Sequence, residues 1–537
     1  MTIELMVHPG YATPSARAPR YEGGAPVPTT AATALVTAGG LPDDFSRSAD
    51  REAELALLTH AGTRAALEEM GLSLCSFPTS RGLGQAEARL RAGEGGGGAE
   101  GGAEQLDVLL LASLSPATGN YHTVMRLMRL LAHVPRVRHV RAMWSAHATE
   151  ELVHAAVARL GVGLVVGLHA YRAGSLLLRC PAPFVLVLGG TDVMAMATMG
   201  GPEGARGAVM LRAARAARRL VAFSAEMVEG LGRLEGAAGG DGGGGGEGGA
   251  PGEAAGAARP IVPAVIPQAV VLPAAICAAA SRGAAEAADG GWSLRARLGL
   301  RAGDWLLLLP LGLRPVKDPL FLLDAAAAWH AEDPRAHLLL VGPALEPACS
   351  AATLAHLGLA GANADAAAAV ATATALPSEE QSAARLRATG VSFLAPLPRS
   401  KLLRGMWEAN AVVNCSVSEG MSNALLEAMA VGTPLVVRRN AGNESLVSHG
   451  STGLLFDSAT EFVRQAQRLL GGGAGNAGAA AAAGAAAGAV YEPGLAAHLV
   501  AGAGEFVRAK HGVSAELRAY AELVDSVAAT CKLTAVT

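Results

Sequence analysis

Residues 416–456 constrain the fold most, because they have the spacing of one compact βαβ unit. An apolar run at residues 411–417 leads into a short polar loop, a helix of small residues and a second apolar run. Gly432 can end the helix in the left-handed conformation, and Pro434 cannot continue it. We therefore predict a helix over residues 423–431.

Two carboxylates lie on either side of the turn in this unit. Glu419 follows the first strand, and Glu427 is the only charged residue in an otherwise apolar helix. In an open parallel sheet, the carboxyl ends of strands and the amino ends of helices meet at one crevice. A buried Glu427 would need a hydrogen-bonding partner, such as a ligand hydroxyl. For an arbitrary pair of glutamates, an exposed helix edge and an exposed loop would be the favoured explanation.

The pattern around the glutamates resembles the nucleotide-sugar half of the family-four-like retaining glycosyltransferases, also called glycosyltransferase group 1. Two Glu separated by seven residues occur in SEGMSNALLEAMAVGTPLVV, and AGNESLV and TGLLF follow. Upstream, the similar segments are LLLLPLGLRPVKDP, HLLLVGP and VSFLAPLPRSKLLRGMWEANAVVN. In the N-terminal half, SPATGNYHTVMRLMRLL, VVGLHAYRAG and FVLVLGGTDVM resemble one animal branch of the family. The resemblance covers residues 106–525.

This resemblance implies an α/β fold of the GT-B type, in which two Rossmann-like doubly wound domains face an interdomain cleft. Strand-length apolar runs alternate with helical segments in two series, which favours parallel sheets covered by helices. The first series lies at residues 106–112, 137–143, 163–168, 184–188, 220–223 and 261–266. The second lies at residues 305–310, 338–341, 391–394, 412–415, 435–437 and 453–456.

Composition suggests how these series divide the chain. Residues 1–105 are rich in Pro, Gly, Ala and Ser, which predicts a largely disordered or poorly defined extension. Residues 106–268 would form the acceptor-side domain, with a low-complexity Gly-rich insertion near residues 236–258. Residues 269–492 would form the nucleotide-sugar-binding domain, and residues 493–537 would be helices that cross back toward the N-terminal domain.

Arg314 and Lys317 follow the apolar run at residues 305–310. Asp318 reads as the cap of a helix, with Pro319 at its first position. Two cations beside a positive helix end suit a diphosphate, although a solvated basic loop would be the favoured explanation of the two residues taken alone. The resemblance implies that both hold the pyrophosphate of the donor.

The resemblance also implies roles for the two-Glu block. Glu427 would bind the ribose of the nucleotide, and Glu419 would bind hydroxyls of the transferred sugar. Backbone N–H groups of Gly420, Met421 and Ser422 would meet sugar or phosphate oxygens and stabilise charge on the leaving diphosphate. The chain has no Asp-x-Asp motif, so we expect neither a metal nor a cofactor, the nucleotide sugar being a substrate.

The N-terminal half contributes three further candidates. Gly119 is expected in the first strand-to-helix loop, where a missing side chain would admit donor phosphate or acceptor. His169 resembles a family histidine that contacts the transferred sugar, although a histidine at a strand end is often structural. Tyr171 stands where many members have a second histidine, so the role is open between the two.

We therefore predict a hexosyltransferase-type enzyme that transfers a sugar, with retention and without metal, to an acceptor that the sequence does not identify. The predicted catalytic residues are Glu419, His169, Arg314 and Lys317. The predicted donor-binding residues are Arg314, Lys317, Glu419, Gly420, Met421, Ser422, Glu427 and Gly119. Two alternatives share this donor site, a catalytically silent nucleotide-sugar-binding or scaffold protein and a nucleotide-sugar epimerase or hydrolase.

Charge and composition exclude several other classes. A net charge of −3 without a basic, aromatic-interleaved patch argues against a nucleic-acid partner. Six scattered cysteines without C-x-x-C spacing argue against a zinc site or a disulfide framework. The longest uncharged stretches are Ala and Gly, so we expect no transmembrane segment. The amino terminus lacks an apolar run of signal-peptide length, so we expect a cytoplasmic protein, with an organelle transit peptide as the alternative.

Overall fold

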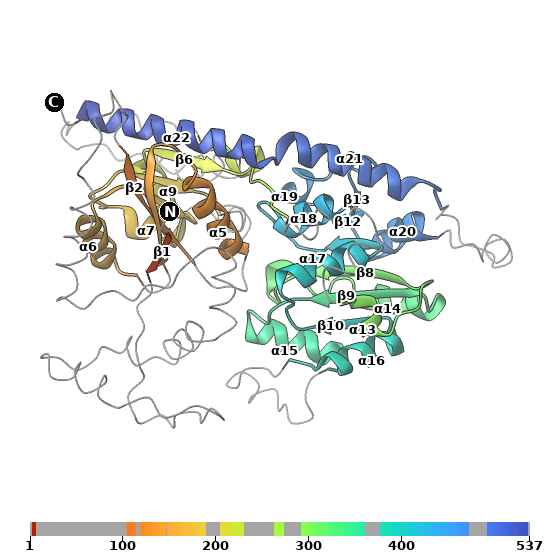
Figure 1. The fold of residues 1–537 in the computed structure, drawn as a ribbon. Helices are drawn as coiled ribbons and strands as arrows, with labels where there is room; N and C mark the ends of the chain where they lie inside the picture. Colours follow the sequence, from red (N-terminus) through yellow and green to blue (C-terminus); the bar gives the residue numbers. More distant parts are fainter. Residues whose placement is uncertain are drawn as a thin grey trace, which may run out of the picture.

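The computed structural model describes residues 3–6, 105–113, 119–145, 148–189, 205–229, 263–272, 291–359, 376–471 and 491–534. The predicted Gly-rich insertion near residues 236–258 and most of the predicted extension over residues 1–105 lie outside these ranges. The described part contains two parallel sheets, each with its own helices, as Figure 1 shows.

The N-terminal sheet has the order β1-β3-β2-β4-β5-β6-β7, with all neighbours parallel. Its strands are β1 (Ile3–Met6), β2 (Leu106–Ala112), β3 (Val137–Trp144), β4 (Val162–Leu168), β5 (Phe184–Val187), β6 (Arg219–Ala222) and β7 (Ala264–Val265). Its helices are α5 (Gly119–Leu131), α6 (Glu150–Leu160), α7 (Gly174–Leu177) and α9 (Ala205–Ala216). The six apolar runs of the first series thus all contain strands.

Strand β1 differs from the prediction. The composition predicts that residues 3–6 belong to the extension, but they pair in parallel with β3, from Ile3 opposite Val140 to Met6 opposite Met143. The outer edge of β3 offers unpaired backbone groups, which a distant segment can satisfy. Four residues are too short a run to reveal such a strand by their pattern.

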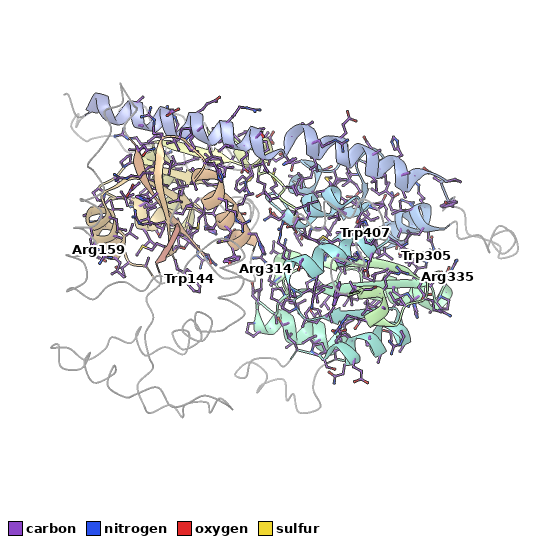
Figure 2. The ribbon with its side chains drawn as sticks, in the orientation of Figure 1. Trp144, Arg159, Trp305, Arg314, Arg335 and Trp407 are labelled. Atoms are coloured by element: carbon purple, nitrogen blue, oxygen red, sulfur yellow. The ribbon has the colours of Figure 1, made fainter. Side chains whose placement is uncertain are left out.

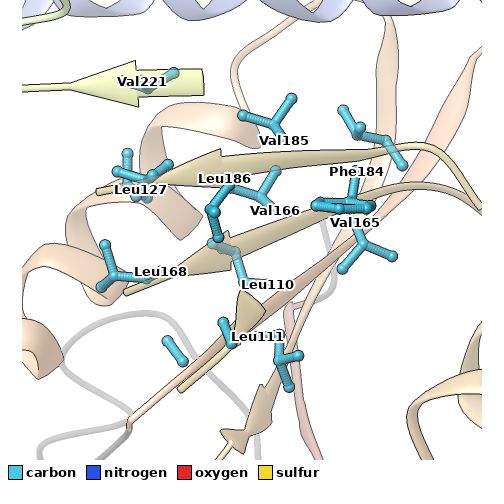
Figure 3. Close-up of a cluster of buried hydrophobic side chains, with 14 of the residues drawn as sticks. Leu110, Leu111, Leu127, Val165, Val166, Leu168, Phe184, Val185, Leu186 and Val221 are labelled. Atoms are coloured by element: carbon cyan, nitrogen blue, oxygen red, sulfur yellow. The ribbon is translucent and has the colours of Figure 1, made fainter. Parts of the chain in front are cut away.

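The N-terminal core consists of strand side chains that are buried on both faces of the sheet. Leu110 of β2, Val166 of β4 and Leu186 of β5 lie close together in Figure 3, and none is more than 2% exposed. Continuous apolar runs, rather than alternating ones, follow from this double burial.

The C-terminal sheet has the order β10-β9-β8-β11-β12-β13. Its strands are β8 (Trp305–Pro310), β9 (Ala336–Val341), β10 (Val391–Leu394), β11 (Ala411–Asn414), β12 (Leu435–Arg438) and β13 (Leu454–Phe456). Its helices are α13 (Leu294–Leu298), η2 (Pro315–Lys317), α14 (Leu323–Glu332), α15 (Pro347–His356), α16 (Glu379–Thr389), α17 (Arg399–Glu408), α18 (Asn423–Val431), α19 (Ala441–Glu444) and α20 (Ala459–Leu470). Leu307 and Leu308 of β8 join different apolar clusters, so both faces of this sheet are covered.

Helices α21 (Leu495–Lys510) and α22 (Val513–Thr534) run along both domains, as the blue ribbon in Figure 1 shows. Leu499 of α21 packs in the C-terminal core, whereas Tyr520 and Val524 of α22 are buried in the N-terminal core. Among the described residues, no helix is long and apolar enough to cross a membrane.

The helical crossing is hydrogen-bonded to residues 263–272, which join the two domains. His511, between α21 and α22, uses its Nδ1 to contact the carbonyl oxygen of Gln268 at 2.8 Å, and its own carbonyl accepts from the N–H of Val270 at 3.0 Å. The buried Glu516 accepts from the N–H of Ala269 at 3.0 Å. The two connections between the domains are therefore fixed to each other.

Candidate active site

A cavity of about 650 Å³ lies between the two domains and is lined by both. Figure 2 labels Arg314 at the side of the C-terminal domain that faces the N-terminal domain. The cavity brings together every site residue predicted from the sequence, namely Gly119, His169, Arg314, Lys317, Glu419, Gly420, Met421, Ser422 and Glu427. We call this cavity the cleft.

Glu419 follows β11 and is only 4% exposed. Its Oε1 accepts hydrogen bonds from Asn414 Nδ2 at 2.9 Å and Ser416 Oγ at 2.7 Å, and it pairs with the ammonium group of Lys317. Burial raises the pKa of the Glu419 carboxyl, but Lys317 and the hydrogen bonds outweigh this effect and hold that pKa below its usual value. Within the described part of the chain, all these donors lie on Oε1, so Oε2 is the oxygen left for a ligand hydroxyl.

A second layer of amides orients this carboxylate. Asn443 is fully buried and donates through Nδ2 to Asn414 Oδ1 at 3.2 Å and to the Arg438 carbonyl at 2.8 Å. Neither Asn443 nor Asn414 is among the site residues that the sequence motifs predict. Asn414 carried a usable signal, because it is a polar residue that ends an apolar strand at the carboxyl edge of the sheet.

Gly442 allows α19 to approach the Glu419 loop. A Cβ at this position would lie 2.0 Å from the Glu419 carbonyl oxygen and 2.8 Å from the Glu419 Cβ. No side chain fits there unless the loop moves.

The loop of Arg314 and Lys317 differs from its prediction. Asp318 is not the N-cap of a following helix, because it is the C-cap residue of η2 (residues 315–317) and α14 begins only at Leu323. Asp318 instead has a left-handed backbone, with φ of 46°, and its carboxylate accepts a hydrogen bond from Arg438. Arg314 Nε is buried and has no hydrogen-bond partner among the described residues, so this cation can still bind a ligand anion.

Glu427 lies in α18, whose bounds match the predicted helix over residues 423–431. Arg399, the first residue of α17, donates through Nε to Glu427 Oε1 at 2.8 Å and through Nη2 to the Val271 carbonyl at 2.6 Å. Burial raises the pKa of the Glu427 carboxyl, and Arg399 only partly opposes this effect. We did not predict Arg399, because no local pattern connects it with a glutamate 28 residues away.

Gly420, Met421 and Ser422 lead into α18. Ser422 is the N-cap residue, but its side chain makes no capping hydrogen bond. The Ser422 side chain therefore leaves the first N–H groups of the helix uncapped, and residues 422–424 line the cleft at this end. Gly432 ends the helix with φ of 80°, as predicted.

Gly119 is the first residue of α5 rather than part of a loop. Its carbonyl accepts from Asn423 Nδ2 at 3.4 Å across the cleft. A Cβ at Gly119 would meet that same nitrogen at 3.6 Å, an ordinary contact. Packing within the protein therefore does not require glycine at this position.

His169 has a left-handed backbone, with φ of 85°. Its Nδ1 accepts from the N–H groups of Tyr171 and Arg172, both at 3.3 Å. An accepting Nδ1 places the proton of the neutral ring on Nε2, which is then a donor. Tyr171 packs against the N-terminal core and beneath Arg206, and it does not line the cleft. Of the two candidates, His169 is the one that reaches the cleft.

The described residues contain no group of three or more His, Cys, Asp and Glu side chains that could hold a metal ion.

A family comparison bears on this site. Residues 376–471 match the model described as Glycosyl transferases group 1. The chain contains a group 1 glycosyl transferase domain. The matched segment of the group 1 domain includes Glu419, Glu427 and Arg399, whereas Arg314 and Lys317 lie before it.

Curated relatives share parts of the chain. Glycosyltransferase 1 domain-containing protein 1 of Xenopus tropicalis is 29% identical over 219 residues, which are 41% of this chain and 50% of that protein. The chain thus spans half of that relative's length.

Solved structures match most of the described fold around the group 1 domain. Alpha,alpha-trehalose 6-phosphate synthase of Burkholderia multivorans is 13% identical with a TM-score of 0.53, over 80% of this chain and 100% of that one. The Anabaena protein HepE, solved in complex with UDP-glucose, is 16% identical with a TM-score of 0.50, over 79% of this chain and 100% of that one. At these identities the likeness concerns the fold alone, and it confirms the predicted GT-B fold.

Proposed function

We propose that this protein is a glycosyltransferase that moves a sugar from a nucleotide-sugar donor to an acceptor bound against the N-terminal domain. One observation carries the proposal. The nine predicted site residues, eight for donor binding and the catalytic candidate His169, come from four separate segments of the chain, and all of them line a single cleft. The group 1 domain supplies five of them, namely Glu419, Gly420, Met421, Ser422 and Glu427.

The diphosphate of the donor would lie at the Arg314 and Lys317 loop. Among the described residues, the buried Nε of Arg314 has no hydrogen-bond partner. The ammonium group of Lys317 pairs with Glu419, and the Lys317 side chain is 14% exposed. When the bond between the sugar and the diphosphate breaks, negative charge grows on the leaving phosphate oxygens. Cations fixed before the reaction stabilise that charge without reorganising.

The transferred sugar would lie against Glu419 and the start of α18. Glu419 stays ionised because Lys317 lowers its pKa, so Oε2 can accept hydrogen bonds from sugar hydroxyls. Backbone N–H groups of Gly420, Met421 and Ser422 would face sugar or phosphate oxygens. His169 would donate from Nε2 on the opposite wall of the cleft.

The ribose of the donor would lie at Glu427. Arg399 engages Oε1 of this carboxylate, so Oε2 remains for the ribose hydroxyls. We propose UDP-glucose as the first donor to assay, because the matching Anabaena structure contains it. We also propose that transfer proceeds with retention and without a metal ion.

Turnover with a panel of UDP-, GDP- and ADP-sugars tests this proposal. Released nucleotide is measured with and without EDTA, and the anomer of the released or transferred sugar is read by NMR. Glu419→Gln is the control, since it removes the charge and keeps the shape. Release that disappears in this variant supports the proposal. Failure of the wild-type protein to bind any nucleotide sugar in the panel refutes it.

A further inference from the structure

The loop that carries Arg314 and Lys317 is held by residues that directly follow β11. The N–H of Val417 donates to the Val316 carbonyl at 3.0 Å. The Sγ of Cys415 contacts the Lys317 carbonyl at 3.2 Å. Burial raises the pKa of the Cys415 thiol to about 12, so the thiol stays protonated and acts as the donor.

Asp318, directly after Lys317, has a backbone conformation that residues other than glycine rarely adopt. Its φ of 46° and ψ of 57° are left-handed. In the described part of the chain, only His169 is another non-glycine residue with positive φ, and His169 lines the cleft. Asp tolerates this region better than most residues, but it persists there only when surrounding contacts hold it.

Arg438, the last residue of β12, supplies such a contact. Its Nη1 donates to Asp318 Oδ2 at 2.8 Å and to the Cys415 carbonyl at 3.3 Å. Its guanidinium lies 3.8 Å from the centroid of the Phe321 ring, which fixes its plane. Neither Arg438 nor Asp318 lines the cleft.

We propose that Asp318 and Arg438 are positioning residues for the donor diphosphate. Their ion pair holds the left-handed turn, and the turn directs the Lys317 ammonium toward Glu419 and the cleft. They act only through Lys317, because neither side chain reaches the cleft. This inference rests on the proposed function, in which Lys317 binds the diphosphate.

Titration of the full-length protein with UDP, GDP and ADP tests the inference. Asp318→Gly keeps the left-handed turn accessible but removes the carboxylate, and Arg438→Met removes the other partner. We expect each to raise the Kd of the nucleoside diphosphate that binds by about tenfold, the order of one charge-assisted hydrogen bond. The double variant should lose no more than either single one, because both changes break the same pair.

A cycle with Lys317→Ala separates positioning from a general structural effect. In the Lys317→Ala background, Asp318→Gly and Arg438→Met should leave the Kd unchanged. Arg439→Met is the matched control, since Arg439 is the next residue and pairs with Glu444 and Asp457 outside the cleft. It should bind as the wild type does.

Two results would overturn the inference alone: wild-type affinity in both single variants, or losses that add to that of Lys317→Ala. If Arg438→Met does not fold, Arg438→Lys and Asp318→Asn take its place and should show a smaller loss. A wild-type protein that binds no nucleoside diphosphate and no nucleotide sugar would instead refute the proposed function.

Discussion

Replacing Gly442 by alanine tests whether α19 sets the position of Glu419. The added methyl group would lie 2.0 Å from the Glu419 carbonyl oxygen, whereas side-chain Cβ contacts under 3.0 Å essentially never occur. The difference between these two distances means that the loop or α19 must move by about 1 Å. That movement is comparable with the misplacements that cost enzymes about 100-fold in rate.

The expected loss of stability follows from the same geometry. Overpacking a well-packed site costs ~1–3 kcal/mol. In a domain of roughly 200 residues, each kcal/mol lowers Tm by about 2–4 °C. We therefore expect Gly442→Ala to lower Tm by several degrees and to reduce donor turnover by about two orders of magnitude.

Thermal unfolding and nucleotide release from the donor check both expectations. Gly303→Ala is the matched control, because a Cβ there meets no heavy atom within 4 Å and Gly303 lies in the same domain. The control should match the wild type in both assays. If Gly442→Ala also matched it, the approach of α19 would not determine the position of Glu419.

Three further predictions concern the cleft. Lys317→Ala should weaken diphosphate binding at least about tenfold. Without the ammonium the pKa of Glu419 should rise, so turnover of this variant should fall further as pH drops, because protonation removes the carboxylate that accepts from the sugar hydroxyls. Burial raises the pKa of the Glu427 carboxyl in the folded state, so wild-type donor affinity should fall as pH drops toward that pKa, and Glu427→Gln should remove this pH dependence. The same raised pKa means that the wild type should lose stability as pH rises from the unfolded-state pKa of this carboxyl to its folded-state pKa. His169→Asn should keep the wild-type Tm, because asparagine tolerates positive φ and can accept the hydrogen bonds from the N–H groups of Tyr171 and Arg172. His169→Ala should lower the Tm. Both variants should lose turnover, measured as released nucleotide.

Each of these predictions has an outcome that contradicts it. Lys510 is an exposed lysine on α21, and Lys510→Met should leave diphosphate affinity unchanged. A loss of affinity equal to that of Lys317→Ala would point to a general charge effect. A pH profile for Glu427→Gln that parallels the wild type would assign the titration to another group. Full turnover in His169→Asn would exclude Nε2 as a donor to the sugar.

Much of the fold was predictable because its strands are buried on both faces. Runs such as LDVLLLA at β2 and WLLLLP at β8 are continuous and apolar, and such runs identify interior parallel strands without knowledge of their neighbours. Strand β1 was not predictable, because a four-residue edge strand depends on its partner β3 rather than on its own pattern.

The residues around the cleft divide in the same way. Glu419, Glu427, Arg314 and Lys317 belong to local motifs, and the sequence placed all of them in one crevice. Arg399 acts through a partner that only the tertiary fold brings near, whereas Asn414 contacts the nearby Glu419 and carries a signal of its own as a polar end to an apolar strand. Asp318 before Pro319 has the local chemistry of a helix cap, but the distant Arg438 binds its carboxylate instead, which no local pattern reveals.

The path of α22 also affects how the chain can fold during synthesis. The core of the N-terminal domain includes Tyr520, Leu523, Val524 and Val527, which leave the ribosome only after the whole C-terminal domain. The N-terminal domain must therefore wait for side chains that are made after the C-terminal domain, with apolar surface beside α5 uncovered in the meantime. The N-terminal core can therefore be completed only after the C-terminal domain has been synthesised. A chain cut before α22 would lose part of its N-terminal core.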